Sequence, residues 1–184
     1  MRRSAIATRS AIAGATLLAI GTATGAGFVL ASDKFAEGNP IPVESTCDGA
    51  DHSPVLQWDG APEGTKAYAL VVADPDAPGG SFVHWILYNV PAAAKSLGGA
   101  MDTTSKLGDG SMQGKNGFGK TGYAGPCPPR GPKHHYVFTL YALSEPLDLE
   151  PGATIDALLA AIKPKKLAET KLTGTYTRAS AQSG

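Results

Sequence analysis

The chain has 184 residues, of which 42% are hydrophobic, 16 are basic and 16 are acidic. This length suits one ordinary domain with a real core once any leader is removed. The first 31 residues hold three of the basic residues and no acid, so the rest carries a formal charge of −3. Such a surface has no basic stripe to neutralise a phosphate backbone, and no nucleic-acid partner is expected.

The N-terminal segment is typical of a targeting sequence. Arg2, Arg3 and Arg9 precede an uncharged run over residues 11–31, which ends in the small-residue pattern that signal peptidase reads. This pattern predicts a signal peptide over residues 1–31, cleaved after Ala31, and export to the periplasm or the medium. The alternative is a retained anchor formed by residues 11–31. That run is long enough to cross a bilayer, but its Gly, Ala and Thr residues make it weakly hydrophobic.

Two cysteines, Cys47 and Cys127, follow the leader. In an exported chain an even pair favours a disulfide, which here would close a loop of roughly 80 residues and stabilise the fold by about 4 kcal/mol. Two buried free thiols are the alternative, because the sequence does not show that the residues meet. Two cysteines alone do not make a structural zinc site.

Residues 68–89 place acids and a histidine around one turn. An apolar run over residues 69–73 predicts a buried strand, and Asp74 and Asp76 follow it around a proline. Glycines then turn the chain into a second strand, residues 82–89, with His84 near its start. The arrangement predicts an acid–imidazole rim at one sheet edge. The alternative is that the aspartates only cap the turn and His84 is a satisfied, half-buried residue.

A second group of polar residues follows a long glycine-rich connection over residues 90–125. Loops of this length in a compact domain are usually functional or mobile. The proline-rich segment 125–132 has a stiff backbone suited to a pocket wall, and it leads into a buried strand that begins near His134. His134 and Tyr136 are two residues apart, so they should point to the same face, while His135 points to the other.

The C-terminal part predicts one short helix over residues 155–162, with Thr154 as its cap. Its spacing places Ile155, Leu158, Leu159 and Ile162 in the core. A last strand over residues 168–177 and a frayed tail over residues 179–184 complete the chain. The predicted fold is therefore all-β dominated: an antiparallel Greek-key β-sandwich with one or two short peripheral helices.

Three motifs in this order resemble the phosphatidylethanolamine-binding protein family, above all its bacterial branch, which is described as Raf-kinase-inhibitor-like. The motifs are residues 74–78 (Asp-Pro-Asp-Ala-Pro), His84 with Asn89 five residues later, and residues 125–131 (Gly-Pro-Cys-Pro-Pro-Arg-Gly) followed by His134 and Tyr136. The resemblance covers nearly all of residues 34–178, so it implies one such domain over residues 32–178.

The resemblance also implies an anion pocket without metal or cofactor. By position, it would be lined by Asp74, Asp76, His84, Tyr123, Pro128, Pro129, His134 and Tyr136. Two departures leave the ligand preference open: His135 stands where animal members carry arginine, and the loop between Gly131 and His134 is shorter. The helical tail that closes the pocket in animal members is not evident after Arg178.

Elementary electrostatics agrees with an anion pocket. Carboxylates that face imidazoles should raise the pKa of those imidazoles, which then donate hydrogen bonds to an anion together with the Tyr136 hydroxyl. The acids would orient the rings or receive an ammonium group. A small anion would fit, and a zwitterionic phospholipid head group would be matched at both ends.

The predicted function is that of a non-enzymatic, exported protein that binds a small anion or a phosphorylated or phospholipid head group. The alternative is an inhibitor or regulator of a protease or kinase-like partner through a separate surface; a homodimer is also compatible with the sequence. Two other kinds of site are alternatives. Asp74, His84 and His134 have the composition of a two-histidine, one-carboxylate metal triad. A hydrolase would need an activated serine, but Ser81 lacks the flanking glycine pattern of a nucleophile elbow.

Overall fold

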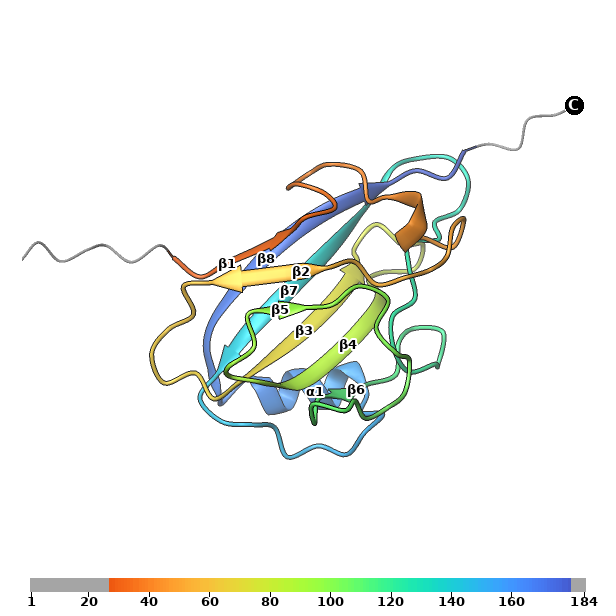
Figure 1. Ribbon diagram of the computed structural model, residues 1–184. Coiled ribbons are helices and arrows are strands. Elements are labelled where there is room, and N and C mark those ends of the chain that lie inside the picture. The colour runs from red at the N-terminus through yellow and green to blue at the C-terminus, as the bar shows by residue number, and fades with distance from the viewer. Residues whose placement is uncertain (1–26, 180–184) are drawn as a thin grey trace, which may run out of the picture.

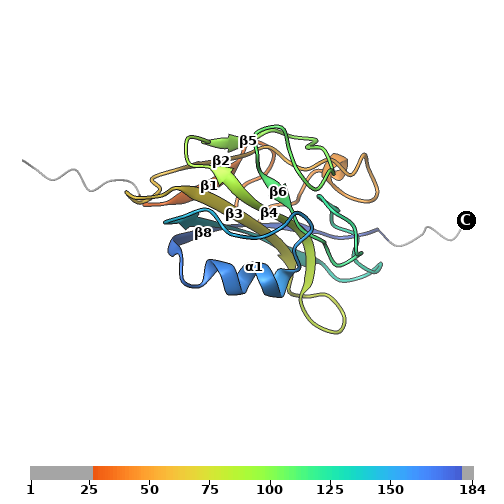
Figure 2. The same cartoon turned by 90° about the horizontal axis from the view of Figure 1, so that it is seen from below.

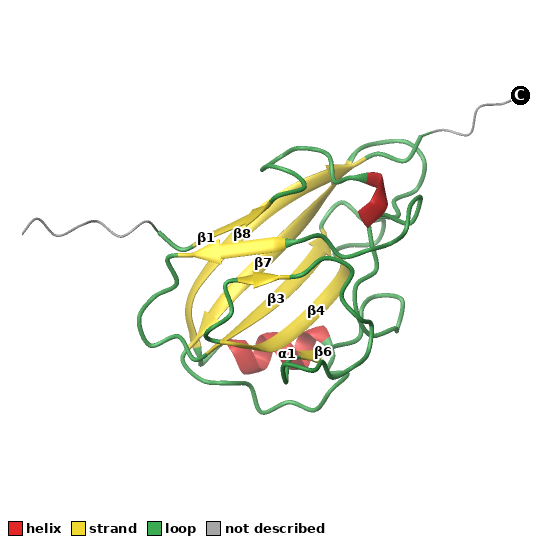
Figure 3. Ribbon diagram, in the orientation of Figure 1, coloured by secondary structure: helices red, strands yellow, loops and turns green. Residues whose placement is uncertain are grey.

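The computed structural model describes residues 27–179, which form two antiparallel sheets and one helix (Figures 1 and 3). The small sheet has the order β1 (Val29–Ser32), β2 (Leu56–Asp59) and β5 (Ser96–Leu97). The large sheet has the order β6 (Met112–Gln113), β4 (Phe82–Pro91), β3 (Ala67–Asp74), β7 (His134–Leu143) and β8 (Lys166–Tyr176). This architecture confirms the predicted antiparallel β-sandwich with short peripheral helices, here α1 (Ile155–Ile162) and the 3-10 turn η1 (Val43–Ser45).

β3 is the centre of the large sheet and is buried on both faces. Its even-numbered residues Tyr68, Leu70 and Val72 pack into the core between the two sheets, against Leu56 and Trp58 of β2. The odd-numbered Ala69 and Val71 face a second core under α1. Because a strand alternates its side chains, a run without polar residues is what a strand covered on both faces requires. Figure 2 shows the resulting layers: small sheet, large sheet, helix.

The predicted helix is present with its predicted bounds, Ile155–Ile162. The Thr154 hydroxyl accepts a hydrogen bond from the backbone N–H of Ala157 at 3.4 Å, as expected for the N-cap residue. Leu158 and Ile162 are buried against the large sheet, but Leu159 is 42% exposed. The prediction that Leu159 belongs to the core was wrong, because this short helix buries only a narrow stripe.

The sheet brings the chemistry-bearing strand ends together. β3 pairs antiparallel with both β4 and β7, so the end of β3 at Asp74 meets the start of β4 at Phe82 and the start of β7. The ladder between β3 and β4 skips His84, since Val72 pairs with Trp85 and Ala73 with Val83. A bulge of this kind re-aims the unpaired residue, here His84, at the edge of the sheet.

The strand β1 overlaps the end of the predicted leader. β1 pairs residue by residue with β2, from Val29 opposite Asp59 to Ser32 opposite Leu56, and Leu30 is only 7% exposed. The cleavage predicted after Ala31 would therefore cut inside β1. An uncharged, small-residue strand next to an uncharged leader offers no sequence signal for the boundary between them. The rest of the predicted leader, residues 1–26, and residues 180–184 of the predicted tail lie outside the described residues.

No helix within residues 27–179 is both long enough and apolar enough to cross a membrane.

Candidate functional site

A buried acid–imidazole pair joins the end of β3 to the start of β7. The Nδ1–H of His134 donates a hydrogen bond to Oδ2 of Asp74 at 2.7 Å, and the two residues are 4% and 3% exposed. The other carboxylate oxygen of Asp74 accepts the backbone N–H of Asp76 at 2.8 Å. Both oxygens of Asp74 are thus engaged, and the His134 ring is fixed with Nδ1 toward the acid and Nε2 away from it.

His84 is fixed by a different contact. Its Nδ1–H donates to the carbonyl oxygen of Ala124 at 2.7 Å, while the backbone N–H of Ala124 donates to the His84 carbonyl at 3.0 Å. Burial lowers the pKa of His84 below its ordinary value, and this effect outweighs the hydrogen bond to Ala124 and the attraction of Asp74. The prediction that nearby carboxylates raise the pKa was therefore wrong for His84, because desolvation is the larger effect.

Both imidazoles line one cavity of about 160 Å³ at this end of the sandwich. Its wall consists of Asp74, Ala77, Pro78, Phe82, His84, Phe118, Cys127, Pro128, Pro129 and His134. Neither His84 nor His134 uses its Nε2 atom in a hydrogen bond with another described residue. The cavity therefore has two oriented ring nitrogens available to a guest. The predicted convergence of Asp74, His84 and His134, together with Pro128 and Pro129, is present.

Asp76 does not belong to this cavity. Its Oδ2 accepts hydrogen bonds from the backbone N–H of His135 at 2.9 Å and from the His135 Nδ1–H at 2.6 Å. Both side chains are more than 40% exposed, and the hydrogen bonds from His135 lower the pKa of the Asp76 carboxyl. The acidic pair predicted to act together is divided: Asp74 faces inward with His134, and Asp76 faces outward with His135.

The two predicted tyrosines lie beside the cavity. Tyr136 is completely buried, its ring contacts that of His84 edge-on at 5.1 Å, and its hydroxyl makes no hydrogen bond of ordinary geometry with a described residue. Burial, together with the charge of the nearby Asp74, raises the pKa of Tyr136, so the hydroxyl stays protonated. Tyr123 is also buried and donates to the carbonyl oxygen of Ser45 at 2.7 Å. It lines a neighbouring, wider cleft.

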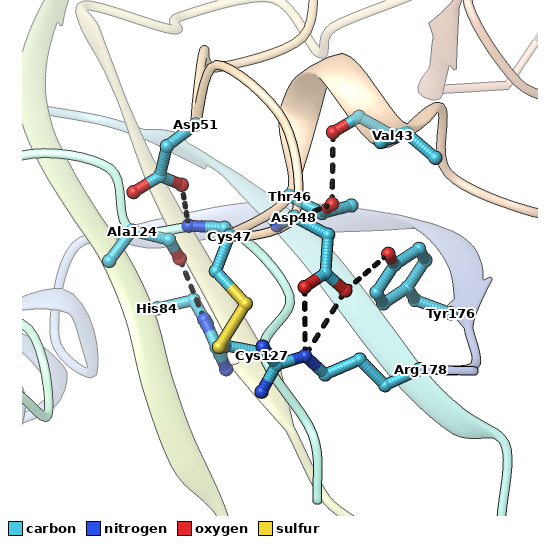
Figure 4. The surroundings of a disulfide bond; sticks show 11 residues. Val43, Thr46, Cys47, Asp48, Asp51, His84, Ala124, Cys127, Tyr176 and Arg178 are labelled. Carbon is cyan, nitrogen blue, oxygen red and sulfur yellow. Dashed lines mark hydrogen bonds and ion pairs between the residues drawn. A yellow bond between two sulfur atoms is a disulfide. The ribbon is translucent and has the colours of Figure 1, made fainter. Parts of the chain in front are cut away.

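The predicted disulfide is part of the wall. Cys47 and Cys127 are joined across 80 residues of chain with a Cα–Cα distance of 5.4 Å. Figure 4 shows the disulfide between the side chains of His84 and Asp48. His84 is held by its hydrogen bond to Ala124. Asp48 accepts hydrogen bonds from Tyr176 at 2.8 Å and from Arg178 at 2.9 Å. The cross-link therefore ties the proline-rich loop to the loop that follows η1.

The resemblance did not indicate Phe82 or Phe118 as site residues. Phe118 is 53% exposed, and its ring packs edge-on against Phe82 at 4.7 Å and lies 6.2 Å from that of His84. The glycine-rich composition of residues 108–125 indicated a functional or mobile loop but did not single out its aromatic residue. The signal that the sequence offered was a phenylalanine between two glycines, Gly117 and Gly119.

Among the described residues, no group of three His, Cys, Asp or Glu side chains is arranged to hold a metal ion. The one cysteine on the cavity wall, Cys127, is joined to Cys47 in the disulfide. The cavity offers charge and hydrogen-bonding capacity in a small, partly apolar space.

Comparisons with known proteins match most of this chain. The family model described as "Phosphatidylethanolamine-binding protein" matches residues 31–177. A UPF0098 protein of Methanothermobacter thermautotrophicus is 45% identical over 149 residues, which are 81% of this chain and 98% of that protein. LppC of Mycobacterium tuberculosis, named as a candidate lipoprotein, is 44% identical over 80% of this chain and 71% of its own length.

A solved structure shares the fold. The crystal structure of Escherichia coli YbcL, described as a new member of the mammalian PEBP family, superimposes with a TM-score of 0.77 at 34% identity. The match covers 83% of this chain and 99% of YbcL. The family model spans most of the chain, and these relatives are matched over most of their own length. The chain therefore belongs to the phosphatidylethanolamine-binding protein family.

Proposed function

We propose that the protein is exported and binds a small anion, or the phosphorylated head group of a larger ligand, in the cavity of Asp74, His84 and His134 without chemical turnover. One observation carries this proposal: two buried imidazoles have their Nδ1 atoms fixed by hydrogen bonds and their Nε2 atoms free on one cavity. Rings held in this way are pre-organised for a guest, so binding does not require ordering them.

The protonation state of His84 determines how strongly the cavity binds an anion. With its pKa lowered by burial, His84 is neutral at pH 7 in the empty protein, and its free Nε2 carries a lone pair. A negative guest favours the protonated ring, which donates a charge-assisted hydrogen bond. Anion binding should therefore take up a proton from solvent, and Asp74 keeps the neighbouring ring of His134 oriented throughout.

The size of the cavity limits what it can hold. About 160 Å³ lies below the ~300–1,000 Å³ of pockets that enclose whole drug-sized ligands. A phosphate, sulfate or carboxylate group fits such a space, whereas a complete phospholipid does not. Phe82, Pro78 and Pro128 give the cavity apolar walls, which lower the local dielectric and strengthen the electrostatic attraction.

Two further observations support the remaining parts of the proposal. Binding without turnover is favoured because the cavity wall has no serine, threonine or lysine among the described residues, its cysteine is held in a disulfide, and the Asp74 carboxylate already accepts two hydrogen bonds. Export is favoured by the same disulfide, since such bonds persist in oxidising compartments, and by the lipoprotein name given to the mycobacterial relative LppC. Regulation of a protease or kinase-like partner, and a homodimer, stay predictions, because the cavity geometry bears on the small ligand alone.

The test is calorimetric titration of the purified protein with sulfate at pH 6. We expect wild type and His135→Ala to bind, and the double variant His84→Ala with His134→Ala to lose binding. Nuclear magnetic resonance of the imidazole Nε2 atoms in wild type provides a reading that does not depend on the variant folding. If sulfate shifts the signals of His135 and leaves those of His84 and His134 in place, the proposed site is wrong.

A further inference from the structure

A second, wider cleft of about 760 Å³ adjoins the anion cavity. Its wall includes Asp51, Thr103, Gly119, Lys120, Thr121 and Tyr123, and it shares Phe118 and Cys127 with the cavity of His84 and His134. The exposed ring of Phe118 and the disulfide are therefore the partition between the two spaces. A ligand seated in the small cavity would have its remaining part directed past Phe118 into the wide cleft.

The loop that forms the partition is built rigidly. Asn116 is 5% exposed; its side-chain oxygen accepts the backbone N–H groups of Phe118 and Lys120, and its amide donates to the Gly122 carbonyl. At Gly117 a Cβ atom would lie 2.5 Å from the Phe82 ring, so only glycine allows this approach. Phe118 and Lys120 are thus presented to the cleft by a fixed turn.

The cleft carries polar groups that make no ion pair or hydrogen bond with other described residues. Lys120 makes no ion pair with another described residue, and its ammonium offers three donors. Asp51 is held by one oxygen, which accepts the Gly125 backbone N–H at 2.6 Å, and its other oxygen makes no hydrogen bond with a described residue (Figure 4). The Thr103 hydroxyl likewise has no partner among the described side chains. The cleft thus offers a cation, a free carboxylate oxygen and a hydroxyl group next to the aromatic ring of Phe118. These groups suit a ligand with several hydroxyl groups.

The two volumes together favour a bipartite ligand. The small cavity is too small for an ordinary ligand, whereas the cleft and cavity together lie within the usual range of about 300–1,000 Å³. A phospholipid would place its glycerol and acyl chains in the cleft, against Lys120, Asp51 and Thr103. Acyl chains would leave these polar groups desolvated and unpaired, which is costly. A water-soluble, hydroxyl-rich body would pair with them.

We propose that the ligand of this protein is a phosphorylated sugar or polyol, with its phosphate between His84 and His134 and its hydroxylated part in the cleft of Phe118, Lys120 and Asp51. This inference rests on the proposed function and names the ligand class for the same site. The carbon skeleton of the sugar lies against the exposed Phe118 ring, and its hydroxyl groups bond to Lys120, to the free oxygen of Asp51 and to Thr103.

The test uses glucose 6-phosphate, inorganic phosphate and vesicles of phosphatidylethanolamine as probes of the full protein, with calorimetry for the first two and co-sedimentation for the vesicles. Glucose 6-phosphate should bind about tenfold more tightly than inorganic phosphate, the worth of one hydrogen bond to a charged group. Lys120→Ala should remove this advantage and leave phosphate affinity unchanged within about twofold. The matched control is Lys163→Ala, which removes a lysine at the end of α1 and should keep the advantage.

The outcomes separate this inference from the proposed function. Equal affinity for phosphate and glucose 6-phosphate, or an advantage that survives Lys120→Ala, overturns the bipartite ligand and leaves the anion cavity standing. Tight binding of the vesicles without binding of glucose 6-phosphate overturns it in favour of a lipid. If neither phosphate nor glucose 6-phosphate binds to wild type, the anion cavity itself is wrong and both proposals fall.

Discussion

Two acid–imidazole pairs link the same two segments of the chain, and they differ almost only in burial. Asp74 and His134 are in contact at 2.7 Å, and Asp76 and His135 at 2.6 Å. The first pair has side chains 4% and 6% exposed, the second 42% and 46%. Because strands alternate their faces, adjacent histidines at the start of β7 point one into the sandwich and one into water.

The comparison shows that residue type and distance do not make a binding site. Water screens the outer pair, which forms on the open surface and contributes little. The inner pair is desolvated, so each partner depends on the other, and His134 lines the small cavity. Burial converts the same chemical pair from a surface contact into a support for a charged guest.

The largest contrast between the pairs should appear in stability. We expect Asp74→Ala to lower the free energy of unfolding by about 3–5 kcal/mol, because it removes one partner of a buried pair and leaves the His134 ring and the Asp76 N–H without their acceptor. Urea denaturation followed by far-ultraviolet circular dichroism measures this loss. A decrease as small as that of Asp76→Ala would show that burial does not distinguish the pairs.

The next contrast is in the pH dependence of sulfate binding. His84 is neutral in the empty cavity because burial lowers its pKa, and a bound anion favours its protonated form. Affinity should therefore rise as the pH falls from 7.5 toward 6, by up to about tenfold per pH unit if one proton is taken up. Sulfate keeps its charge over this range, so the slope reports the protein.

His135→Ala is the control for that measurement and should keep the slope, since His135 faces away from the cavity. A slope that disappears in His135→Ala, or an affinity that does not change with pH in wild type, would contradict the role given to His84.

A smaller effect concerns the stability of the empty protein. The unfolded chain protonates His84 at its ordinary pKa near 6.5, whereas the folded protein holds that pKa lower. Below pH 6.5 the unfolded state thus binds more protons, and the free energy of unfolding should fall as the pH drops from about 6.5 through the folded pKa. His84→Gln should flatten this part of the stability curve, and saturating sulfate should oppose the loss. An unchanged curve in His84→Gln would assign the acid sensitivity to other groups.

The smallest expected effect is that of the outer pair on binding. Asp76→Ala removes an exposed carboxylate and should leave sulfate affinity within about twofold of wild type, because solvent and salt screen its charge. Calorimetry under the conditions used for wild type measures this. A large loss of affinity would place Asp76 in the site, where the sequence had predicted it.

The sequence predicted the elements whose apolar residues follow a regular strand or helix pattern. β3, β4 and β7 are long apolar runs because both faces of the large sheet are covered, and the helix 155–162 has a capping threonine and a terminating proline. The prediction that Asp74 and His134 lie together, although 60 residues apart, came from the family resemblance. The antiparallel pairing of β3 with β7 gives its physical cause.

The features that the sequence did not predict depend on single residues that depart from the regular strand pattern. The alternation of faces ends with β3 at Asp74, so it could not indicate that Asp76 turns outward. The bulge that redirects His84 is one residue in one ladder, and its effect on the pKa comes from burial. The start of β1 inside the predicted leader has no compositional signal, since both are uncharged.

The most direct measurement is a crystal structure of the protein grown in sulfate at pH 6, in which both pairs compete for the same anion. We predict sulfate in the small cavity, with an oxygen about 3 Å from Nε2 of His84 and another from Nε2 of His134. Sulfate bound at Asp76 and His135 with the small cavity free of it would contradict the claim that burial of the inner pair makes the site.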